Sequence, residues 1–299
     1  MPAAQHILPC EPRAMRLRTM TTADIHAGMH LKDISGWNQT EHDWQRFLNA
    51  SPNGCFVAEV DGRVVGTVAT ISYQDKFAWV GMVLVDPEHR GRGIGTYLLE
   101  QAVEFLDATK IPTIKLDATP LGKPLYEKMG FATEYEVERL ILKRSFPDVP
   151  FSRDAVLKQR VANAQLEAIL RLDGDYFGAD RGSLLVSLDH EAPEFTLAAV
   201  QDGYVAAYMF GRKGSFADHI GPWASEDPRW SRQLLTSFLQ RSSRDTVIAD
   251  CLKSNSSAGH LLREHGFSYS RPLTRMYRGA NRFPGNHKDL CAILGPEFG

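Results

Sequence analysis

Cysteine is scarce in this sequence, and no two cysteines lie close together. The four are Cys10, Cys55, Cys251 and Cys291, without any C-x-x-C pair. This spacing argues against both a disulfide framework and a zinc knuckle. His26 and His30 lie one predicted helical turn apart, but no third ligand accompanies them. We therefore predict that the protein binds no metal.

The sequence also lacks an excess of charge and any long apolar run. Its 299 residues carry a net charge of −2, so the basic excess that nucleic-acid binding requires is missing. The first twenty residues contain prolines and no apolar stretch long enough for a signal sequence. No later run approaches the ~20 residues that span a bilayer. We expect a cytoplasmic protein with neither nucleic acid nor membrane as a partner.

Strand and helix signals alternate along the first half. The predicted strands are 15–20, 77–85 and 113–118, with a hairpin over 55–73 around Asp61-Gly62 and one or two strands over 131–142. The predicted helices begin after caps at Thr21 and Thr40, at Thr96, and at 124–129 before Gly130. Segment 143–154, with Pro147 and Pro150, is the predicted linker. We therefore place one domain at 1–147 and another at 152–299.

The second half repeats the order of the first. The matching dipeptides are Asp61-Gly62 with Asp202-Gly203, Asp86-Pro87 with Asp227-Pro228, Leu98-Leu99 with Leu234-Leu235, and Gly130-Phe131 with Gly266-Phe267. The first two pairs are 141 residues apart (202 − 61 and 227 − 86), and the last two are 136 apart (234 − 98 and 266 − 130). The register shifts between Pro87 and Leu98, where the first half has a glycine-rich loop. We interpret the pattern as a duplication that produced two similar domains.

The glycine-rich loop, "RGRGIGT" at 90–96, joins a buried strand to a helix. Free backbone N–H groups and the positive end of a helix dipole converge at such a junction, which makes it a candidate anion site. Arg90 and Arg92 add positive charge, and the glycines let a phosphate approach the backbone. The missing lysine excludes a nucleoside-triphosphate loop. Asp117 keeps a dinucleotide site open as an alternative, although the glycine spacing departs from G-x-G-x-x-G.

The spacing Arg90-x-x-Gly93-x-Gly95, followed by a helix and by "LYEKMGF" at 125–131, resembles the coenzyme A signature of the GNAT superfamily of N-acyltransferases. The resemblance covers roughly residues 15–145. The second half resembles the second domain of tandem GNAT proteins, mainly through "LLREHGF" and "LTRMYRG". The resemblance implies an α/β (α+β) fold of two GNAT-like domains, each a mixed, mostly antiparallel sheet flanked by helices.

The resemblance also implies acetyl-CoA as a co-substrate and a set of residues that hold it. The amides of the glycine loop would bind the pyrophosphate, and the preceding strand would pair with the pantetheine arm. The implied cofactor-binding residues are Val83, Leu84, Val85, Arg90, Gly91, Arg92, Gly93, Ile94, Gly95, Thr96 and Tyr126.

Direct attack of an amine on an acyl thioester sets the chemical groups that catalysis needs. The amine must lose a proton, the developing oxyanion needs an N–H donor, and the thiolate must leave. The resemblance implies the Leu84 amide for the oxyanion and Tyr126 as the acid for the sulfur. The base stays open among Asp117, Glu41, Asp43, Asp75, His26, His30, His42 and water. The predicted acceptor contacts are Trp37, Asn38 and Trp44, in a region that lines the acceptor pocket in the family.

The second copy lacks the groups that the first copy would use. Between Pro228 and Leu234 it has only "RWSRQ", and Leu262 stands where the first copy has Tyr126. We predict an acetyl-CoA-dependent N-acetyltransferase with one active site, in the first domain, that acts on a small-molecule or peptide amine. We expect the second domain to cover part of the acceptor cleft or to form a homodimer surface. The alternative hypothesis is a non-catalytic acyl-CoA-binding or regulatory module.

Overall fold

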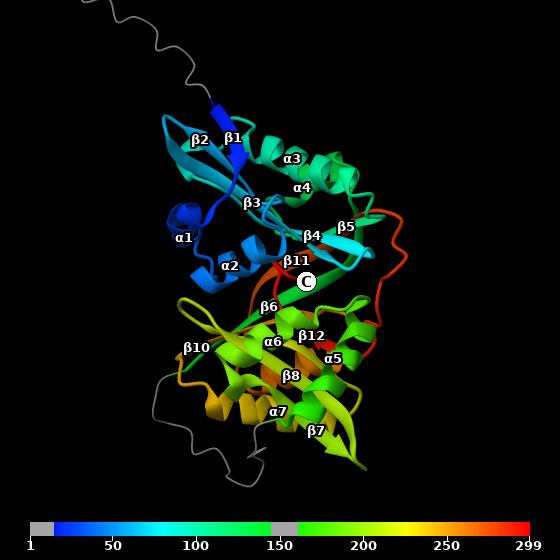
Figure 1. The fold of residues 1–299 in the computed structure, drawn as a ribbon. Helices are drawn as coiled ribbons and strands as arrows, with labels where there is room; N and C mark the ends of the chain where they lie inside the picture. Colours follow the sequence, from blue (N-terminus) through cyan, green and yellow to red (C-terminus); the bar gives the residue numbers. More distant parts are fainter. Residues whose placement is uncertain (1–14, 145–160) are drawn as a thin grey trace, which may run out of the picture.

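The computed structural model describes residues 15–144 and 161–299 (Figure 1). The predicted domain boundaries at 147 and 152, and most of the predicted linker, lie outside the described residues. Within the described ranges, no helix is long and apolar enough to cross a membrane. In the same ranges, no group of three His, Cys, Asp or Glu side chains is placed to hold a metal ion. The three cysteines described, Cys55, Cys251 and Cys291, are free and buried.

The first half alternates strands and helices in the predicted order. Its elements are β1 (Met15–Thr19), α1 (Ile25–Ile34), α2 (Glu41–Ala50), β2 (Phe56–Val60), β3 (Arg63–Tyr73), β4 (Phe77–Val85), α3 (Ile94–Ala108), β5 (Thr113–Ala118), α4 (Lys123–Lys128) and β6 (Ala132–Lys143). Thr40 and Asp43 form a capping box at the start of α2, as their spacing predicts. The hairpin between β2 and β3 turns at Asp61 and Gly62, which both have positive φ.

The described part of the second half, 161–299, repeats this order from α1 to β6, without a counterpart of β1, and adds one strand at its end. Its elements are α5 (Asn163–Phe177), α6 (Gly182–Glu191), β7 (Leu197–Gln201), β8 (Tyr204–Lys213), β9 (Asp218–Ser225), α7 (Pro228–Arg241), β10 (Thr246–Leu252), α8 (Ser256–Glu264), β11 (Ser268–Gly279) and β12 (Leu290–Ala292). The β2–β3 and β7–β8 hairpins start 141 residues apart (197 − 56 and 204 − 63), and β6 and β11 start 136 apart (268 − 132). The three-dimensional elements therefore follow the repeat that the sequence predicts. Strand β12 is an addition outside that repeat.

The two halves exchange their last long strands. The sheet has the order β1-β2-β3-β4-β5-β11-β6-β10-β12-β9-β8-β7, and most neighbours are antiparallel. Strand β11 of the second half pairs with β5 of the first, whereas β6 of the first half pairs with β10 of the second. Figure 1 shows β6 in green and β11 in orange crossing between the halves. The expected fold class is confirmed, and the exchange joins the two expected sheets into one.

Two equivalent ion pairs hold the exchanged strands. Arg275 of β11 donates to both oxygens of Asp117 on β5, at 2.9 and 2.8 Å. Arg139 of β6 donates to both oxygens of Asp250 on β10, each at 2.7 Å. Arg275 is the repeat counterpart of Arg139 (275 − 139 = 136), and all four side chains are buried or nearly so. We call Asp117–Arg275 and Asp250–Arg139 the exchange pairs.

The largest apolar core also belongs to both halves. Helices α3 and α4 cover one face of the first half's strands with a core of their own, which includes Leu98, Leu99 and Tyr126. The opposite face shares a core with the second half, in which Phe47 of α2 stacks on Phe298 with ring centres 4.7 Å apart. Because burial of apolar surface dominates folding, we infer that the two halves are stabilised as one packed unit.

Candidate active site

The pocket of about 890 Å³ lies where β4 and β5 diverge. These parallel strands pair only at Ala78 with Ile114 and at Trp79 with Lys115. Beyond that point β4 is irregular: Met82 has a φ of 55°, and the Thr67 hydroxyl donates to the Met82 carbonyl at 2.8 Å. A positive φ at a non-glycine residue is strained and is typical of functional sites. The backbone edge of β4 from 80 to 85 thus faces the pocket instead of a neighbouring strand.

The glycine loop forms the outer end of the pocket. Gly91 and Gly93 have φ of 74° and 80°, and a Cβ on either would meet no atom within 4 Å. Glycine is needed there for the backbone conformation, and the space beside it is open. Gly93 caps α3 without a side-chain hydrogen bond, and the Tyr97 amide donates to the Gly93 carbonyl at 3.0 Å. The amides of residues 94–96 therefore have no helical acceptor and remain available to an anion.

The two arginines of the loop differ in position. Arg90 lines the pocket, and its Nε donates to the carbonyl of Val85 at 3.0 Å. Arg92 is outside the pocket lining and donates to the carbonyl of Glu88 at 3.0 Å. The remaining predicted cofactor residues, Val83, Leu84, Val85, Gly91, Gly93, Ile94, Gly95, Thr96 and Tyr126, all line the pocket.

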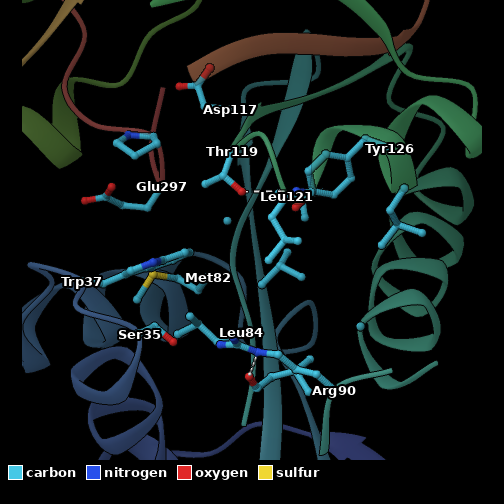
Figure 2. Close-up of a pocket in the computed structure, with 18 of the residues that line it drawn as sticks. Ser35, Trp37, Met82, Leu84, Arg90, Asp117, Thr119, Leu121, Tyr126 and Glu297 are labelled. Carbon is cyan, nitrogen blue, oxygen red and sulfur yellow. Dashed lines mark hydrogen bonds between the residues drawn. The ribbon is translucent and has the colours of Figure 1, made fainter. Parts of the chain in front are cut away.

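Tyr126 reaches the pocket from α4. Figure 2 shows its ring extending from the helix toward Thr119 and Leu121. The missing side chain of Gly122 makes room for it, because a Cβ there would lie 2.9 Å from the ring. Burial raises the pKa of Tyr126 to about 12. Within the described residues its hydroxyl makes no hydrogen bond, so it is a protonated donor without a partner.

Of the predicted bases, only Asp117 lines the pocket in the described ranges, where His89 and Glu297 line it as well. Both of its oxygens accept hydrogen bonds from Arg275. Burial raises the pKa of Asp117, and the Arg275 charge opposes that shift. Asp250 makes the equivalent pair in the half that has no glycine loop. An ion pair that also occurs in the half without a glycine loop does not depend on catalysis. The geometry therefore favours a structural role for Asp117, in which it attaches β11 to β5.

The predicted acceptor contacts separate into two groups. Trp37 lines the pocket, close to Met82 in Figure 2. Asn38 is instead buried between the halves, where its side chain accepts from the Ala217 amide and donates to the Ala217 carbonyl, each at 3.0 Å. Trp44 is fully buried, and a Cβ on Gly28 would lie 2.8 Å from its ring. Neither Asn38 nor Trp44 lines the pocket, so of the three only Trp37 can contact an acceptor there.

The last residues of the chain also line the pocket. Pro296 and Glu297 line it, and a Cβ on Gly81 would lie 2.6 Å from the Glu297 carbonyl. The Trp79 indole donates to the Pro296 carbonyl at 3.0 Å, and the Glu297 carboxylate pairs with Arg212. The first half therefore builds its pocket directly against the tail that follows β12.

Other pocket residues could not be predicted from the first half alone. These are Arg271 and Leu273 on β11, and Pro296 and Glu297 in the tail. Strand exchange and tail docking bring them to the site, and neither leaves a local signal in the sequence. The internal repeat offers the only indication, because it aligns Arg139 with Arg275 and so marks the strands that meet.

The second half fills the region that is open in the first. Strand β12 pairs with β9 at Trp223 and Ala224 and with β10 at Cys251, so it lies between those two strands. The start of α7 is also occupied, because the Asp227 carboxylate accepts from the Arg229 amide at 2.7 Å. In the described part of the second half, β12 thus occupies the place of the gap between the corresponding strands, and Asp227 caps the first free amide of α7.

Comparisons with known proteins agree with this geometry. The model of the acetyltransferase (GNAT) family matches residues 24–131, and that of an acetyltransferase (GNAT) domain matches residues 169–292. The chain is 27% identical to holothin acyltransferase from a Pseudoalteromonas species over 88% of this chain and 87% of that protein. It is 26% identical to the uncharacterized N-acetyltransferase YitH of Bacillus subtilis over 80% of this chain and 83% of that protein.

Solved structures share the fold along the whole chain. A putative acetyltransferase from Pyrococcus horikoshii superimposes with a TM-score of 0.78 over 99% of both chains, at 22% identity. A GCN5-related N-acetyltransferase from Sphaerobacter thermophilus gives a TM-score of 0.64 over 89% of this chain and 95% of that one, at 16% identity. The glycine loop, the diverging strands and both family matches lead to one conclusion: the chain belongs to the GNAT acetyltransferase family, carries two GNAT domains in tandem, and is an enzyme of acyl transfer.

Proposed function

We propose that the protein transfers an acetyl group from acetyl-CoA to a primary amine at a single site in the first half. The observation that carries the proposal is the continuous pocket from the glycine loop, along the free edge of β4, to Tyr126. The second half supports a single site because β12 lies between β9 and β10. The relative named holothin acyltransferase supports acyl transfer by a chain of this length and organisation.

The residues of the first half fit the coenzyme. Open space beside Gly91 and Gly93 and the free amides at the start of α3 suit a pyrophosphate. The edge of β4 over Val83–Val85 offers backbone groups to an extended amide chain such as pantetheine. When bound, acetyl-CoA supplies the acyl thioester.

Two groups of the chain would then assist the transfer. A backbone N–H on the free edge of β4 would stabilise the oxyanion that develops as the amine attacks. The predicted donor, Leu84, pairs with Thr67 in the register in which the Asp86 amide donates to the Val65 carbonyl, so its N–H is directed toward β3, and the neighbouring N–H of Val83 is the better donor. Tyr126 would donate its proton to the departing thiolate. Its hydroxyl is protonated at neutral pH, as that of an ordinary tyrosine is, and it has no competing acceptor within the described residues.

The proposed function is tested by two measurements on the full chain. Calorimetry with acetyl-CoA should show binding to one site per chain. Release of coenzyme thiol should then depend on an added primary amine, across a panel of small amines and peptides. Absence of coenzyme binding would reject the site, and binding without amine-dependent thiol release would favour the non-catalytic alternative.

The glycine loop gives a sharper prediction. Replacing Gly93 by glutamate should weaken acetyl-CoA binding by roughly 100-fold, because two like charges at ~4 Å repel by ~1–4 kcal/mol between bulk water and a protein surface. Gly203→Glu is the matched control, since Gly203 also has a positive φ (84°) and open space around it, but lies in the β7–β8 hairpin. The two variants should lose similar stability by thermal melting. Equal coenzyme affinities of the two variants would reject the loop as the phosphate site.

A further inference from the structure

Arg271 is a pocket residue that the second half supplies. On the exchanged strand β11, Thr274 pairs with Ala118 at the end of β5, so Arg271 stands beyond the end of β5. Side chains alternate along a strand, and Arg271, Leu273 and Arg275 therefore share one face of the sheet. Leu273 also lines the pocket, so this face of β11 is the one that meets it.

The internal repeat offers a direct comparison for Arg271. Its counterpart in the first half is Tyr135 (271 − 135 = 136), and the register sets Arg271 opposite Arg139 just as it sets Tyr135 opposite Arg275. The Tyr135 hydroxyl accepts a hydrogen bond of 2.5 Å from Arg275. At the pocket, two guanidinium groups stand opposite each other instead. Like charges in directly opposite positions destabilise a sheet, so Arg271 is unfavourable for the fold at this place.

Only one of these two arginines is neutralised within the protein. Arg139 is held by both oxygens of Asp250. Arg271, by contrast, makes no hydrogen bond or ion pair in the described part of the chain. It is half-buried, and burial together with the Arg139 charge lowers its pKa, while the charge of Asp250, which is already paired with Arg139, opposes that shift. A guanidinium nevertheless stays charged at working pH, and a partly buried charge without an internal partner calls for an anion from outside.

From this placement, we propose that Arg271 binds a carboxylate on the acceptor, so that the substrate is an amine that also carries a carboxylate group. The inference rests on the proposed function, because it names the acceptor of that same site. The planar fork of a guanidinium matches the two oxygens of a carboxylate. Through the exchanged strand β11, the second half thus contributes a residue that selects the substrate.

The place of Arg271 separates this anion from the coenzyme phosphates. The glycine loop follows β4, whereas Arg271 lies on β11, on the other side of β5 in the sheet. The phosphates are expected at the start of α3, next to Arg90. Arg139, which stands opposite Arg271 in the sheet, is close enough to the tail for the Glu297 charge to act on its pKa, and Arg271, Pro296 and Glu297 all line the pocket. The acceptor is therefore the ligand that reaches Arg271.

The test uses pairs of amines that differ by one charge: glycine, phenylalanine and 4-aminobutyrate, each against its primary amide. Binding to the coenzyme A-saturated protein is measured by calorimetry, and turnover is measured separately by thiol release. We expect the wild type to bind the acids about 10- to 100-fold more tightly than the amides, as charged hydrogen bonds allow. Arg271→Gln should remove this preference, and Arg271→Lys should restore part of it.

The thermal stability of Arg271→Gln distinguishes ligand binding from a structural role. If Arg271 stabilised the fold, this variant would have a lower Tm than the wild type. Arg271→Gln removes a like charge opposite Arg139, so its Tm should be equal to or higher than that of the wild type. Arg263→Gln is the control for net charge, since Arg263 is partly exposed on α8 and outside the pocket lining. A clear fall in Tm for Arg271→Gln alone would assign Arg271 to the fold and overturn the proposal.

The outcomes distinguish this inference from the proposed function. Equal binding of acids and amides by the wild type would overturn the carboxylate site while leaving the transferase proposal intact. Weaker acetyl-CoA binding by Arg271→Gln, with unchanged acid preference, would also overturn it and assign Arg271 to the coenzyme. Selective binding of the acids without any thiol release would support the carboxylate site and reject the transferase proposal.

Discussion

Replacing Tyr126 by phenylalanine should lower kcat by about 10²- to 10⁴-fold while the affinity for acetyl-CoA stays nearly unchanged, which is the range expected for loss of a general acid. The ring still fills the space beside Gly122, so the packing of α4 is retained. Only the proton donor to the departing thiolate is lost. Stopped-flow or steady-state thiol release measures kcat, and calorimetry measures the coenzyme Kd.

Tyr176→Phe is the matched control for Tyr126→Phe. Burial raises the pKa of Tyr176 to about 12 as it does for Tyr126, but Tyr176 lies on α5, away from this pocket. It should leave kcat unchanged. A similar kcat in Tyr126→Phe and the wild type would remove Tyr126 from the mechanism.

The same pKa gives a pH dependence. A general acid works while it is protonated, that is, below its pKa, and burial places the pKa of Tyr126 at about 12. The wild-type kcat should therefore not fall near pH ~10, where an ordinary tyrosine titrates. A fall there that is absent from Tyr126→Phe would show a Tyr126 hydroxyl more exposed than the structure indicates.

Replacing Asp117 or Asp250 by asparagine should lower the free energy of unfolding by about 3–5 kcal/mol in each case, because either change leaves a buried guanidinium without its partner. Each aspartate holds the arginine of the exchanged strand beside it, and Asp250 also pairs with His219 Nε2 at 3.0 Å, so Asp250→Asn should lose at least as much stability as Asp117→Asn. Urea denaturation followed by tryptophan fluorescence measures the loss. Glu264→Gln, which breaks an exposed pair with Arg232, is the control and should cause no measurable change.

These variants also decide between a structural and a chemical role for Asp117. If Asp117 only attaches β11, both asparagine variants should keep comparable turnover at temperatures where they are folded. If Asp117 is the base, Asp117→Asn alone should lose turnover and the acidic limb of its pH profile. Circular dichroism at the assay temperature verifies that each variant is folded.

Local signals in the sequence were sufficient for much of the first half. The caps at Thr21 and Thr40, the Asp61-Gly62 turn and the strand before Arg90 each depend on a few neighbouring residues. The conformational need for glycine at Gly91 and Gly93 is likewise local, since it follows from a positive φ. The repeat offsets of 141 and 136 then extended this prediction to the second half.

The pairing of distant segments could not be predicted from such local signals. Strands β6 and β11 are copies of one element and have similar patterns of apolar and polar residues. Either strand could therefore pair with β5 or with β10, and the sequence does not show which pairing forms. The three residues of β12 are too few for a strand signal, and only packing between β9 and β10 defines them. Asn38 and Trp44 were predicted to contact the acceptor but are buried away from the pocket. The polarity and size of a side chain do not show which side of a loop is buried.

Whether a feature could be predicted from the sequence depends on how far apart the interacting residues lie along the chain. Composition, turn chemistry and the glycine loop identified a GNAT domain and a degenerate copy, because those features act within a few residues of one another. The arrangement that sets Arg271 and Glu297 at the pocket arises only when strands and tail from the second half pack on the first. Such contacts depend on the sum of buried area, strand register and ion pairing across the whole sheet. The proposed coenzyme side of the site could therefore be predicted from the sequence, whereas the proposed acceptor side forms only in the folded protein.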